Sequence, residues 1–267
     1  MPLRLAPTLR DRLAATDRPL AGMWLCTGSP LVAEILAGGE PDWVLIDMEH
    51  APLTLESVAA QLQAIAAYDT TPVVRVPAND PVLIKQVLDL GAQSVLVPMV
   101  SSADEARAAV AAVRYPPLGV RGVGSALARS ARWNRVEGYL ANADRYTALF
   151  VQIETAAGVA AAAEIAAVEG VDGVFVGPSD LAASMGLIGQ QSHPEVVAAV
   201  RRTFEAVRDA GTPVGVNAFD PALARQYAAD GARFVLVAAD VAVLARASEQ
   251  VAAEWRDPSA GPTRASY

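Results

Sequence analysis

Short apolar runs, four to six residues long, recur along the chain and alternate with longer segments whose apolar residues have helical spacing. Runs of this length bounded by turn residues are typical of β-strands. Eight such strands alternating with helices in 267 residues predict one domain with the closed (β/α)8 fold of a TIM barrel. An open doubly wound sheet is the alternative, because periodicity does not reveal closure. The predicted strands are 21–26, 43–47, 73–76, 94–98, 149–154, 173–177, 214–217 and 234–238.

Helices are expected in the segments between these strands. One of them has clear end signals, since Asn79-Asp80-Pro81 offers a capping side chain followed by proline and Gly91 follows as a stop. The barrel domain is expected to span residues 1–256, and 257–267, with proline, glycine and serine, to form a loose tail. The other predicted helices are 55–68, 102–113, 158–169, 181–185, 194–210, 221–230 and 241–255.

One connection is much longer than the rest. Between the helix that ends near Arg114 and the strand that begins at Leu149 lies a segment containing the sequence YPPLGVRGVGS, residues 115–125. Connections of this length within a domain are usually lids or binding loops. Its glycines would let backbone amides approach an anion, but flexibility without binding is an equal alternative.

Composition and charge exclude several classes of protein. A formal net charge of −8 argues against nucleic acid or an anionic membrane surface as partner. The N-terminus has no signal-peptide pattern, and no apolar run approaches the length of a membrane span. A single cysteine, Cys26, permits no intrachain disulfide, which is consistent with the cytoplasm.

Two acids follow neighbouring predicted strands. Side chains alternate along a strand, so Phe150, Gln152 and Glu154 share one face. Asp180 follows the next strand, and the carboxyl ends of parallel strands meet at the edge where such barrels bind ligands. Paired carboxylates at this edge suit a hard divalent cation such as Mg²⁺ or Mn²⁺. The alternative is that Glu154 begins a loop and Asp180 caps the helix at 181–185.

Further polar side chains are expected at the same edge. Arg75 interrupts an apolar strand and therefore needs an anionic partner, either a barrel acid or a substrate. His50 titrates near neutral pH and is a candidate base. Asp89 lies in the last turn of its helix, where the helix dipole disfavours its charge, so it needs a partner, and orienting His50 would be one such role. The remaining strand-end candidates are Trp24, Asp47, Glu49, Ser179 and Asn217.

Five motifs, in this order, resemble those of the HpcH/HpaI aldolases: LIDMEHAP (45–52), RVP (75–77), YPPLGVRGVG (115–124), QIE (152–154) and VGPSD (176–180). The resemblance covers nearly the whole chain. It implies a (β/α)8 barrel and a metal-dependent class II pyruvate aldolase. It also implies a homo-oligomer, commonly a hexamer built as a trimer of dimers, with a terminal helix exchanged between subunits. Met48 departs from the family, which often has a small residue there.

The resemblance also implies a role for each matching residue. Metal binding falls to Glu154 and Asp180, with Mg²⁺ or Mn²⁺ expected, Co²⁺, Ni²⁺ or Zn²⁺ as alternatives, and Asp47 and Glu49 around the site. Gln152 and Ser179 would contact the keto acid, together with Arg75, and Trp24 joins them from its strand-end position. The catalytic roles would fall to His50 as general base, Asp89 as the acid that raises its basicity, and Arg75 as the group that stabilises the enolate.

The implied reaction is reversible aldol addition of pyruvate or hydroxypyruvate to an aldehyde, giving a 4-hydroxy-2-oxo acid. Its partners are two small molecules, a 2-oxo acid and an aldehyde. A lysine Schiff base is disfavoured, because the sole lysine, Lys85, is placed on a helix rather than at a strand end. Two alternatives remain. One is a coenzyme A ester lyase of the same superfamily, with Arg121, Arg129 and Arg132 binding the cofactor's phosphates, and the other is a non-catalytic barrel that senses keto acids.

Overall fold

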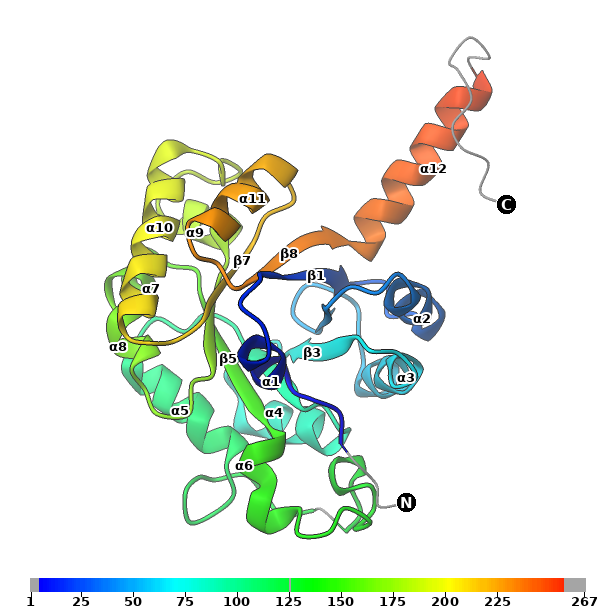
Figure 1. Ribbon diagram of the computed structural model, residues 1–267, viewed down its shortest axis with the longest axis vertical. Helices are drawn as coiled ribbons and strands as arrows, with labels where there is room; N and C mark the ends of the chain where they lie inside the picture. The colour runs from blue at the N-terminus through cyan, green and yellow to red at the C-terminus, as the bar shows by residue number, and fades with distance from the viewer. Residues whose placement is uncertain (1–4, 125, 257–267) are drawn as a thin grey trace.

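Eight parallel strands form a closed barrel in the computed structural model of the chain, which describes residues 5–124 and 126–256. Each strand pairs with the next one in sequence, and β1 pairs with β8, which closes the sheet. The helices surround this barrel (Figure 1). The predicted (β/α)8 fold is therefore confirmed, and the open doubly wound sheet is excluded.

All eight predicted strands are present, and their ends differ from the predicted ones by two residues at most. The burial of nearly every strand residue explains why short apolar runs identified them: the inner face packs in the barrel and the outer face packs against helices. The strands are β1 (Leu20–Leu25), β2 (Trp43–Asp47), β3 (Thr71–Arg75), β4 (Ser94–Val97), β5 (Ala148–Ile153), β6 (Gly173–Val176), β7 (Val214–Asn217) and β8 (Phe234–Ala239).

The helices differ from the predicted ones in two respects. The segment 158–169 forms two short helices rather than one, and the helices α1, α2 and α6 were not predicted. The predicted tail, 257–267, lies outside the described residues. The α-helices are α1 (Leu9–Ala14), α2 (Pro30–Gly38), α3 (Leu55–Ile65), α4 (Pro81–Asp89), α5 (Ala103–Val113), α6 (Ala143–Tyr146), α7 (Ala156–Ala160), α8 (Ala162–Ala166), α9 (Pro178–Ser184), α10 (Pro194–Asp209), α11 (Pro221–Ala229) and α12 (Asp240–Arg256), and the 3₁₀ turns are η1 (Arg129–Ala131) and η2 (Leu140–Asn142).

Aromatic side chains fill the barrel interior. Trp43, Phe150, Phe175 and Phe234 are almost fully buried and contact one another at ring-centroid distances of 5.4–6.4 Å, mostly edge to face. The amino end of the barrel is closed by α1, whose Leu9 and Leu13 belong to the same buried cluster, and Figure 1 shows α1 lying across the middle of the barrel. The interior is thus a packed core, and in barrels of this kind ligands bind at the carboxyl end of the strands.

The long connection, residues 114–147, begins where α5 ends and returns to the start of β5. Both points lie at the amino end of the barrel, because a helix in a βα unit runs back from the carboxyl end of its strand. Arg129 in this segment contacts the carbonyl oxygens of Leu62 and Leu90, at or near the ends of α3 and α4, which agrees with that placement. The connection therefore does not cover the carboxyl end of its own barrel, and its function as a binding loop stays a prediction.

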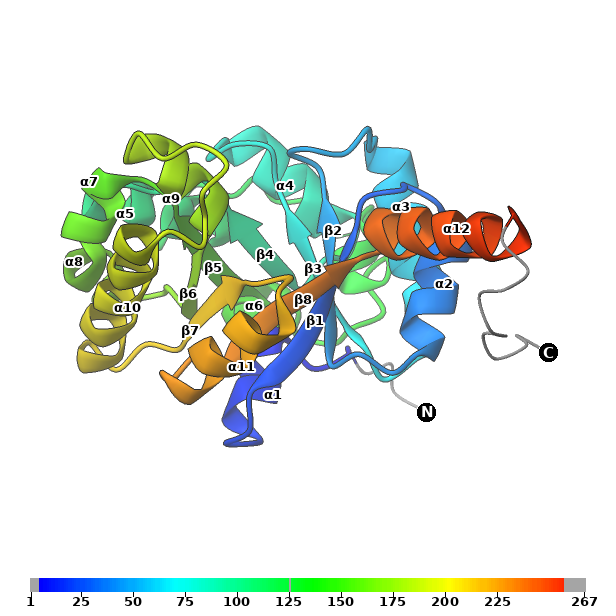
Figure 2. The same ribbon diagram turned by 90° about the horizontal axis from the view of Figure 1, so that it is seen from above.

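The last helix, α12, leaves the barrel after β8 and extends away from it (Figures 1 and 2). It begins at the buried Asp240, whose carboxylate accepts hydrogen bonds from the backbone amides of Cys26 and Thr27 at 2.9 Å. Apolar side chains along it are exposed, including Leu244 at 62% and Trp255 at 88%. Across the described residues, no helix combines the length and the hydrophobicity that a bilayer crossing requires.

Candidate active site

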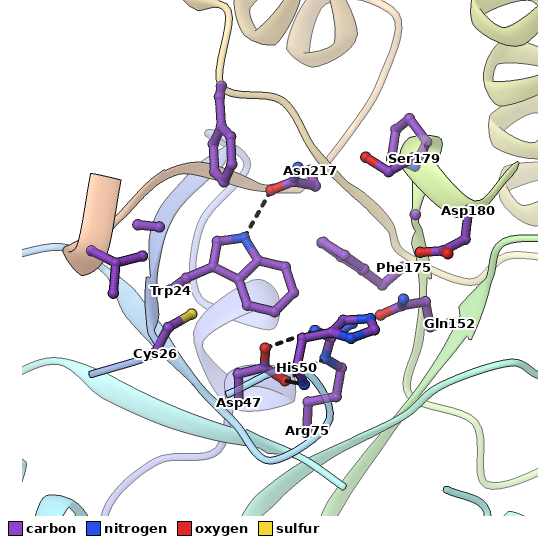
Figure 3. A pocket seen from close by; sticks show the side chains of 15 residues that line it. Trp24, Cys26, Asp47, His50, Arg75, Gln152, Phe175, Ser179, Asp180 and Asn217 are labelled. Atoms are coloured by element: carbon purple, nitrogen blue, oxygen red, sulfur yellow. Dashed lines mark hydrogen bonds and ion pairs between the residues drawn. The ribbon is translucent and has the colours of Figure 1, made fainter. Parts of the chain in front are cut away.

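A cavity of about 290 Å³ opens at the carboxyl end of the barrel. Most of the sequence-predicted site residues line it, and they come from seven different strands or the loops directly after them (Figure 3). Because each strand delivers its last residues to the same mouth, groups that are far apart in the sequence meet here. The lining comprises Trp24, Cys26, Asp47, His50, Arg75, Gln152, Phe175, Gly177, Pro178, Ser179, Asp180, Asn217, Phe219, Ala239 and Val241.

Arg75 ends β3 and is held in place on several sides. Its Nε and Nη2 atoms donate to the two carboxylate oxygens of Asp47 at 2.9 Å each, and Nη1 lies 2.7 Å from Glu49 Oε2. The guanidinium also lies 4.4 Å from the centroid of the Trp24 ring. Arg75 is only 4% exposed, and its two-bond ion pair with Asp47 holds the guanidinium group in one orientation. Arg75 thus has a barrel acid as its partner, which was one of the two alternatives, and it also lies on the cavity wall, where a substrate could contact it.

Trp24 is fixed by a second contact, with a residue two strands away in the barrel. Its indole Nε1 donates to Asn217 Oδ1 at 2.8 Å, which joins β1 to the end of β7 past the intervening β8 (Figure 3). The sequence places both residues at strand ends but does not reveal this bond. The Trp24 ring is thus held by two contacts, with the Arg75 guanidinium over its face and Asn217 at its indole nitrogen.

Glu154 directly follows β5 and is 1% exposed. Its Oε1 accepts a hydrogen bond from the backbone amide of Met99 at 2.7 Å, and its Oε2 accepts one from the side chain of Gln152. The pKa of the Glu154 carboxyl is raised to about 7. Burial is the main cause and the negative charges of Glu49 and Asp180 add to it, while the two hydrogen bonds act in the opposite direction. A nearby cation would strongly favour the ionised form of a buried carboxyl that has two acidic neighbours.

Gly177 has a part in the site that the sequence analysis did not assign to it. A Cβ atom at this position would lie 2.8 Å from Glu154 Oε2 and 3.1 Å from Gln152 Nε2. Glycine is therefore required for the two side chains to lie where they do. The signal was available, because a strand that ends in glycine and proline often makes room for a ligand-binding group.

Asp180 lies in the first turn of α9, which begins at Pro178. The helix starts three residues earlier than predicted and is preceded by Gly177, so the interpretation of Asp180 as its cap is wrong. Ser179 and Asp180 are both exposed and line the cavity on the side opposite Asp47 (Figure 3). A carboxylate in this position can contact a ligand directly.

His50 lines the same cavity and is largely open to solvent, with 64% of its side chain exposed. Its Nε2 atom lies 4.0 Å from Glu49 Oε2. Asp89, by contrast, ends α4 at the amino end of the barrel and pairs there with Arg121 at 3.1 Å. The structure does not bring Asp89 and His50 together within one chain, because a whole helix separates the two ends of the βα unit.

The donor atoms at the mouth fit a hard divalent cation. Glu154 and Asp180 supply carboxylate oxygens, and the buried Gln152 Oε1 has no hydrogen-bond partner. Within residues 5–124 and 126–256, no group of three or more histidine, cysteine, aspartate and glutamate side chains is arranged to hold a metal. Two carboxylates and the amide oxygen of Gln152 would leave further coordination positions of such a cation open to substrate or water. Soft ligation through Cys26 is disfavoured, because burial raises the pKa of its thiol to about 12.

Fold and site together define an enzyme of the (β/α)8 class that works on a small polar ligand at the carboxyl end of its barrel. The model of the HpcH/HpaI aldolase/citrate lyase family matches residues 20–247. The chain belongs to this family. The matched range contains all eight strands of the barrel and every residue that lines the active-site cavity.

Similar proteins agree with this assignment. The 4-hydroxy-2-oxo-heptane-1,7-dioate aldolase of Salmonella dublin is 52% identical over 92% of this chain and 93% of its own length. A crystal structure of an HpcH/HpaI aldolase/citrate lyase family protein from Burkholderia cenocepacia J2315 is 45% identical, with a TM-score of 0.89, and covers 93% of this chain and 99% of that one. The HpcH/HpaI aldolase of Desulfitobacterium hafniense DCB-2 is 28% identical, with a TM-score of 0.87, and covers 94% and 98%.

Proposed function

We propose that the chain is a class II aldolase that catalyses the reversible addition of pyruvate or hydroxypyruvate to an aldehyde, giving a 4-hydroxy-2-oxo acid. The observation that supports the proposal is that Asp180, Arg75 and His50 line one cavity at the mouth of the barrel. The buried Glu154 is not part of that lining, but it lies close enough to Asp180 for the charge of Asp180 to raise its pKa. Relatives of the same family at 52% identity are aldolases that act on 4-hydroxy-2-oxo-heptane-1,7-dioate, as their name states.

Glu154 and Asp180 would hold a divalent cation, Mg²⁺ or Mn²⁺ in preference to Co²⁺, Ni²⁺ or Zn²⁺, because both ligands are carboxylates. When bound, such a cation acts as a Lewis acid that makes the C3 protons of the 2-oxo acid more acidic. Glu49 and Asp47 would stay outside the metal's ligands. Their part is to hold Arg75, which both contact directly.

Arg75 would stabilise the negative charge that develops on the keto oxygen of the substrate. Its guanidinium is already oriented by Asp47 and covered by Trp24, so little reorganisation is needed when that charge appears. Gln152 and Ser179, which line the same cavity, would bind the oxygen atoms of the 2-oxo acid.

His50 would act as the base for the hydroxyl at C4. In the cleavage direction the imidazole accepts the hydroxyl proton, directly or through water, the C3–C4 bond breaks, and its electron pair remains with C3 of the oxo acid. The aldehyde leaves, and a proton is returned to C3. A positioned base of this kind contributes roughly 10² to 10⁴ in rate.

A role for Asp89 beside His50 requires a second copy of the chain. Asp89 keeps one carboxylate oxygen outside its ion pair with Arg121, and its side chain is 28% exposed. The exposed apolar side chains of α12 support an assembly in which this helix packs on a neighbouring subunit, as expected for a hexamer with exchanged terminal helices. The single cysteine is the ground for proposing the cytoplasm as its location.

The structure disfavours a coenzyme A ester lyase. Arg121, Arg129 and Arg132 belong to the long connection at the amino end of the barrel, away from the cavity of their own chain. Arg121 is also only 1% exposed and therefore not free to bind a phosphate. Cleavage of malyl- or citryl-coenzyme A at a rate matching that of 4-hydroxy-2-oxo acids would restore this alternative.

The test is exchange of the C3 protons of pyruvate for deuterium, followed by NMR, before and after metal removal and reconstitution. We expect exchange that is lost with a chelator and restored by Mg²⁺ or Mn²⁺. Asp180→Ala should abolish it, and Asp104→Ala, which removes a 90% exposed carboxylate on α5, should leave it unchanged. Turnover retained by Asp180→Ala after thorough chelation, or borohydride trapping of pyruvate on Lys85, would overturn the proposal.

A further inference from the structure

A second cavity, of about 180 Å³, lies directly beside the active-site cavity. The two share four lining residues, which therefore form the partition between them: Pro178, Ser179, Asn217 and Phe219. The rest of the second cavity is formed by the loop before α10 and the start of α11, through Gln191, Ser192, Ala218, Asp220 and Leu223. A substrate longer than a few atoms can thus extend from the reacting centre past the partition.

The lining of this second cavity is polar but carries no positive charge. The side chains of Ser179, Gln191 and Ser192 have no hydrogen-bond partner within the part of the chain that the structure describes, so their hydrogen-bonding groups are available to a ligand. The one charged side chain is Asp220, whose Oδ1 caps α11 by accepting from the amide of Leu223 at 2.8 Å. Hydroxyl groups match this surface, whereas a carboxylate or phosphate would meet a like charge and no cation.

The active-site cavity offers no free cation either. Arg75 is the one lysine or arginine among the described lining residues, and its charge is already paired with two carboxylates. Asp180 adds a further negative charge on the same wall. An anionic group on the far end of an aldehyde would therefore find no complementary charge in either cavity of this chain.

Asn217, in the partition, has a fixed amide orientation. The indole nitrogen of Trp24 can only donate, so the atom of Asn217 that faces it must be the carbonyl oxygen. The amide nitrogen is then directed away from Trp24, and no protein acceptor for it exists among residues 5–124 and 126–256. Asn217 thus presents N–H donors to an oxygen of the ligand where the two cavities meet.

We propose that the second cavity binds the uncharged, hydroxylated chain of the acceptor aldehyde, and that Asn217 is a specificity-determining residue which recognises a hydroxyl oxygen next to the reacting carbonyl. This inference rests on the proposed aldolase function. It predicts that this chain does not prefer the aldehyde released from 4-hydroxy-2-oxo-heptane-1,7-dioate. Breaking the C3–C4 bond of that acid leaves a four-carbon aldehyde with a terminal carboxylate, for which the two cavities offer no positive charge.

The experiment compares acceptors of equal carbon number, with pyruvate as donor and the full-length metal-loaded protein. Values of kcat/KM are measured for glyceraldehyde against propanal, and for succinate semialdehyde against butanal. We expect the hydroxyl groups to raise kcat/KM, and the carboxylate to lower it. Asn217→Leu should reduce the ratio of glyceraldehyde to propanal about fivefold, the effect of one hydrogen bond.

Two further variants separate recognition from packing. Asn217→Asp keeps an acceptor for Trp24 but removes the N–H donors, so it should reduce the same ratio. Gln191→Leu should reduce the ratio of erythrose to butanal, whereas Gln190→Leu, at the exposed neighbour outside the cavity, should not. Because each value is a ratio within one variant, a loss of folded protein cancels.

An unchanged glyceraldehyde-to-propanal ratio in both Asn217 variants would overturn the inference, as would a wild-type preference for succinate semialdehyde over butanal. It would also be overturned if the Asn217 variants altered only the choice between pyruvate and hydroxypyruvate. Absence of C3 proton exchange in pyruvate would instead refute the aldolase function itself, so the two failures are distinguishable.

Discussion

The burial of Glu154 makes the stability of the metal-free protein depend on pH. The pKa of this carboxyl is raised from 4.5 to about 7 in the folded chain, mainly by loss of solvent. A raised pKa means that the folded state binds the proton more tightly than the unfolded state does. Stability is therefore greatest below the unfolded pKa and falls as the pH rises toward the folded value. The loss attributable to Glu154 between pH 5 and 8 is about 2–3 kcal/mol, at 1.36 kcal/mol per pKa unit.

The variant Glu154→Gln should lack this part of the pH dependence, because glutamine is neutral throughout. Urea unfolding of chelator-treated protein at fixed concentration, at pH 5 and pH 8, measures the difference between wild type and variant. We expect the variant to gain about 2–3 kcal/mol relative to wild type over that interval. Glu164→Gln, the same change at an exposed glutamate on α8, should follow the wild type.

Metal should offset the disadvantage that the ionised Glu154 gives the wild type at pH 8. Mn²⁺ at about 100 times its dissociation constant stabilises the wild type by about 2.7 kcal/mol if it binds only the folded state. Glu154→Gln, which lacks a ligand, should gain much less. Parallel pH profiles for the two metal-free proteins would refute the reasoning, since Glu154 would then ionise normally. Equal stabilisation of both by Mn²⁺ would refute the placement of the metal.

Three other changes test separate parts of the structure. Arg75→Lys keeps a charge but loses the planar fork, so C3 deuterium exchange should slow about 10²-fold, and unchanged exchange would contradict the role of Arg75. Gly22→Ala should cost about 1–3 kcal/mol in urea unfolding, because its Cβ would overlap the Trp43 ring; an unaltered midpoint would contradict this packing. Leu244→Glu, at a 62% exposed position on α12, should reduce the oligomer size seen by light scattering, and an unchanged mass would exclude α12 from the interface.

The strands could be predicted because each is a short apolar run bounded by turn residues, and the fold buries both faces of it. Helix α1 could not be predicted from its apolar pattern, because three of its six residues are charged and only Leu9 and Leu13 are buried. Its remaining signal is a capping box, formed by Thr8 and Asp11. The segment after Glu154 was also misjudged, because helix propensity is high throughout an alanine tract and does not show where a break occurs, here at Ala161.

The sequence predicted those parts of the candidate site whose position follows directly from the end of a strand. Glu154 follows β5 and Asp180 follows β6, so both had to reach the carboxyl end. Asp89 was associated with His50 although its place at the end of a helix puts it at the other end of the barrel, which the βα geometry could have indicated. The contact of Trp24 with Asn217, 193 residues away, exists only because the closed barrel brings β1 and β7 to either side of β8, and it leaves no trace in either segment.

Within the described residues, the buried aromatic side chains that fill the barrel lie beneath the active-site cavity, so substrates would enter and leave it through its mouth. Gln152 and Arg75 lie deep, at 2% and 4% exposure, whereas the His50 side chain is 64% exposed at the rim. A 2-oxo acid resting on the deep groups would be covered by an aldehyde placed above it, so addition should follow an ordered sequence in which the oxo acid arrives first and departs last. Initial-rate kinetics should then show pyruvate competing directly with the aldol product for the free enzyme, with the aldehyde acting only on the binary complex.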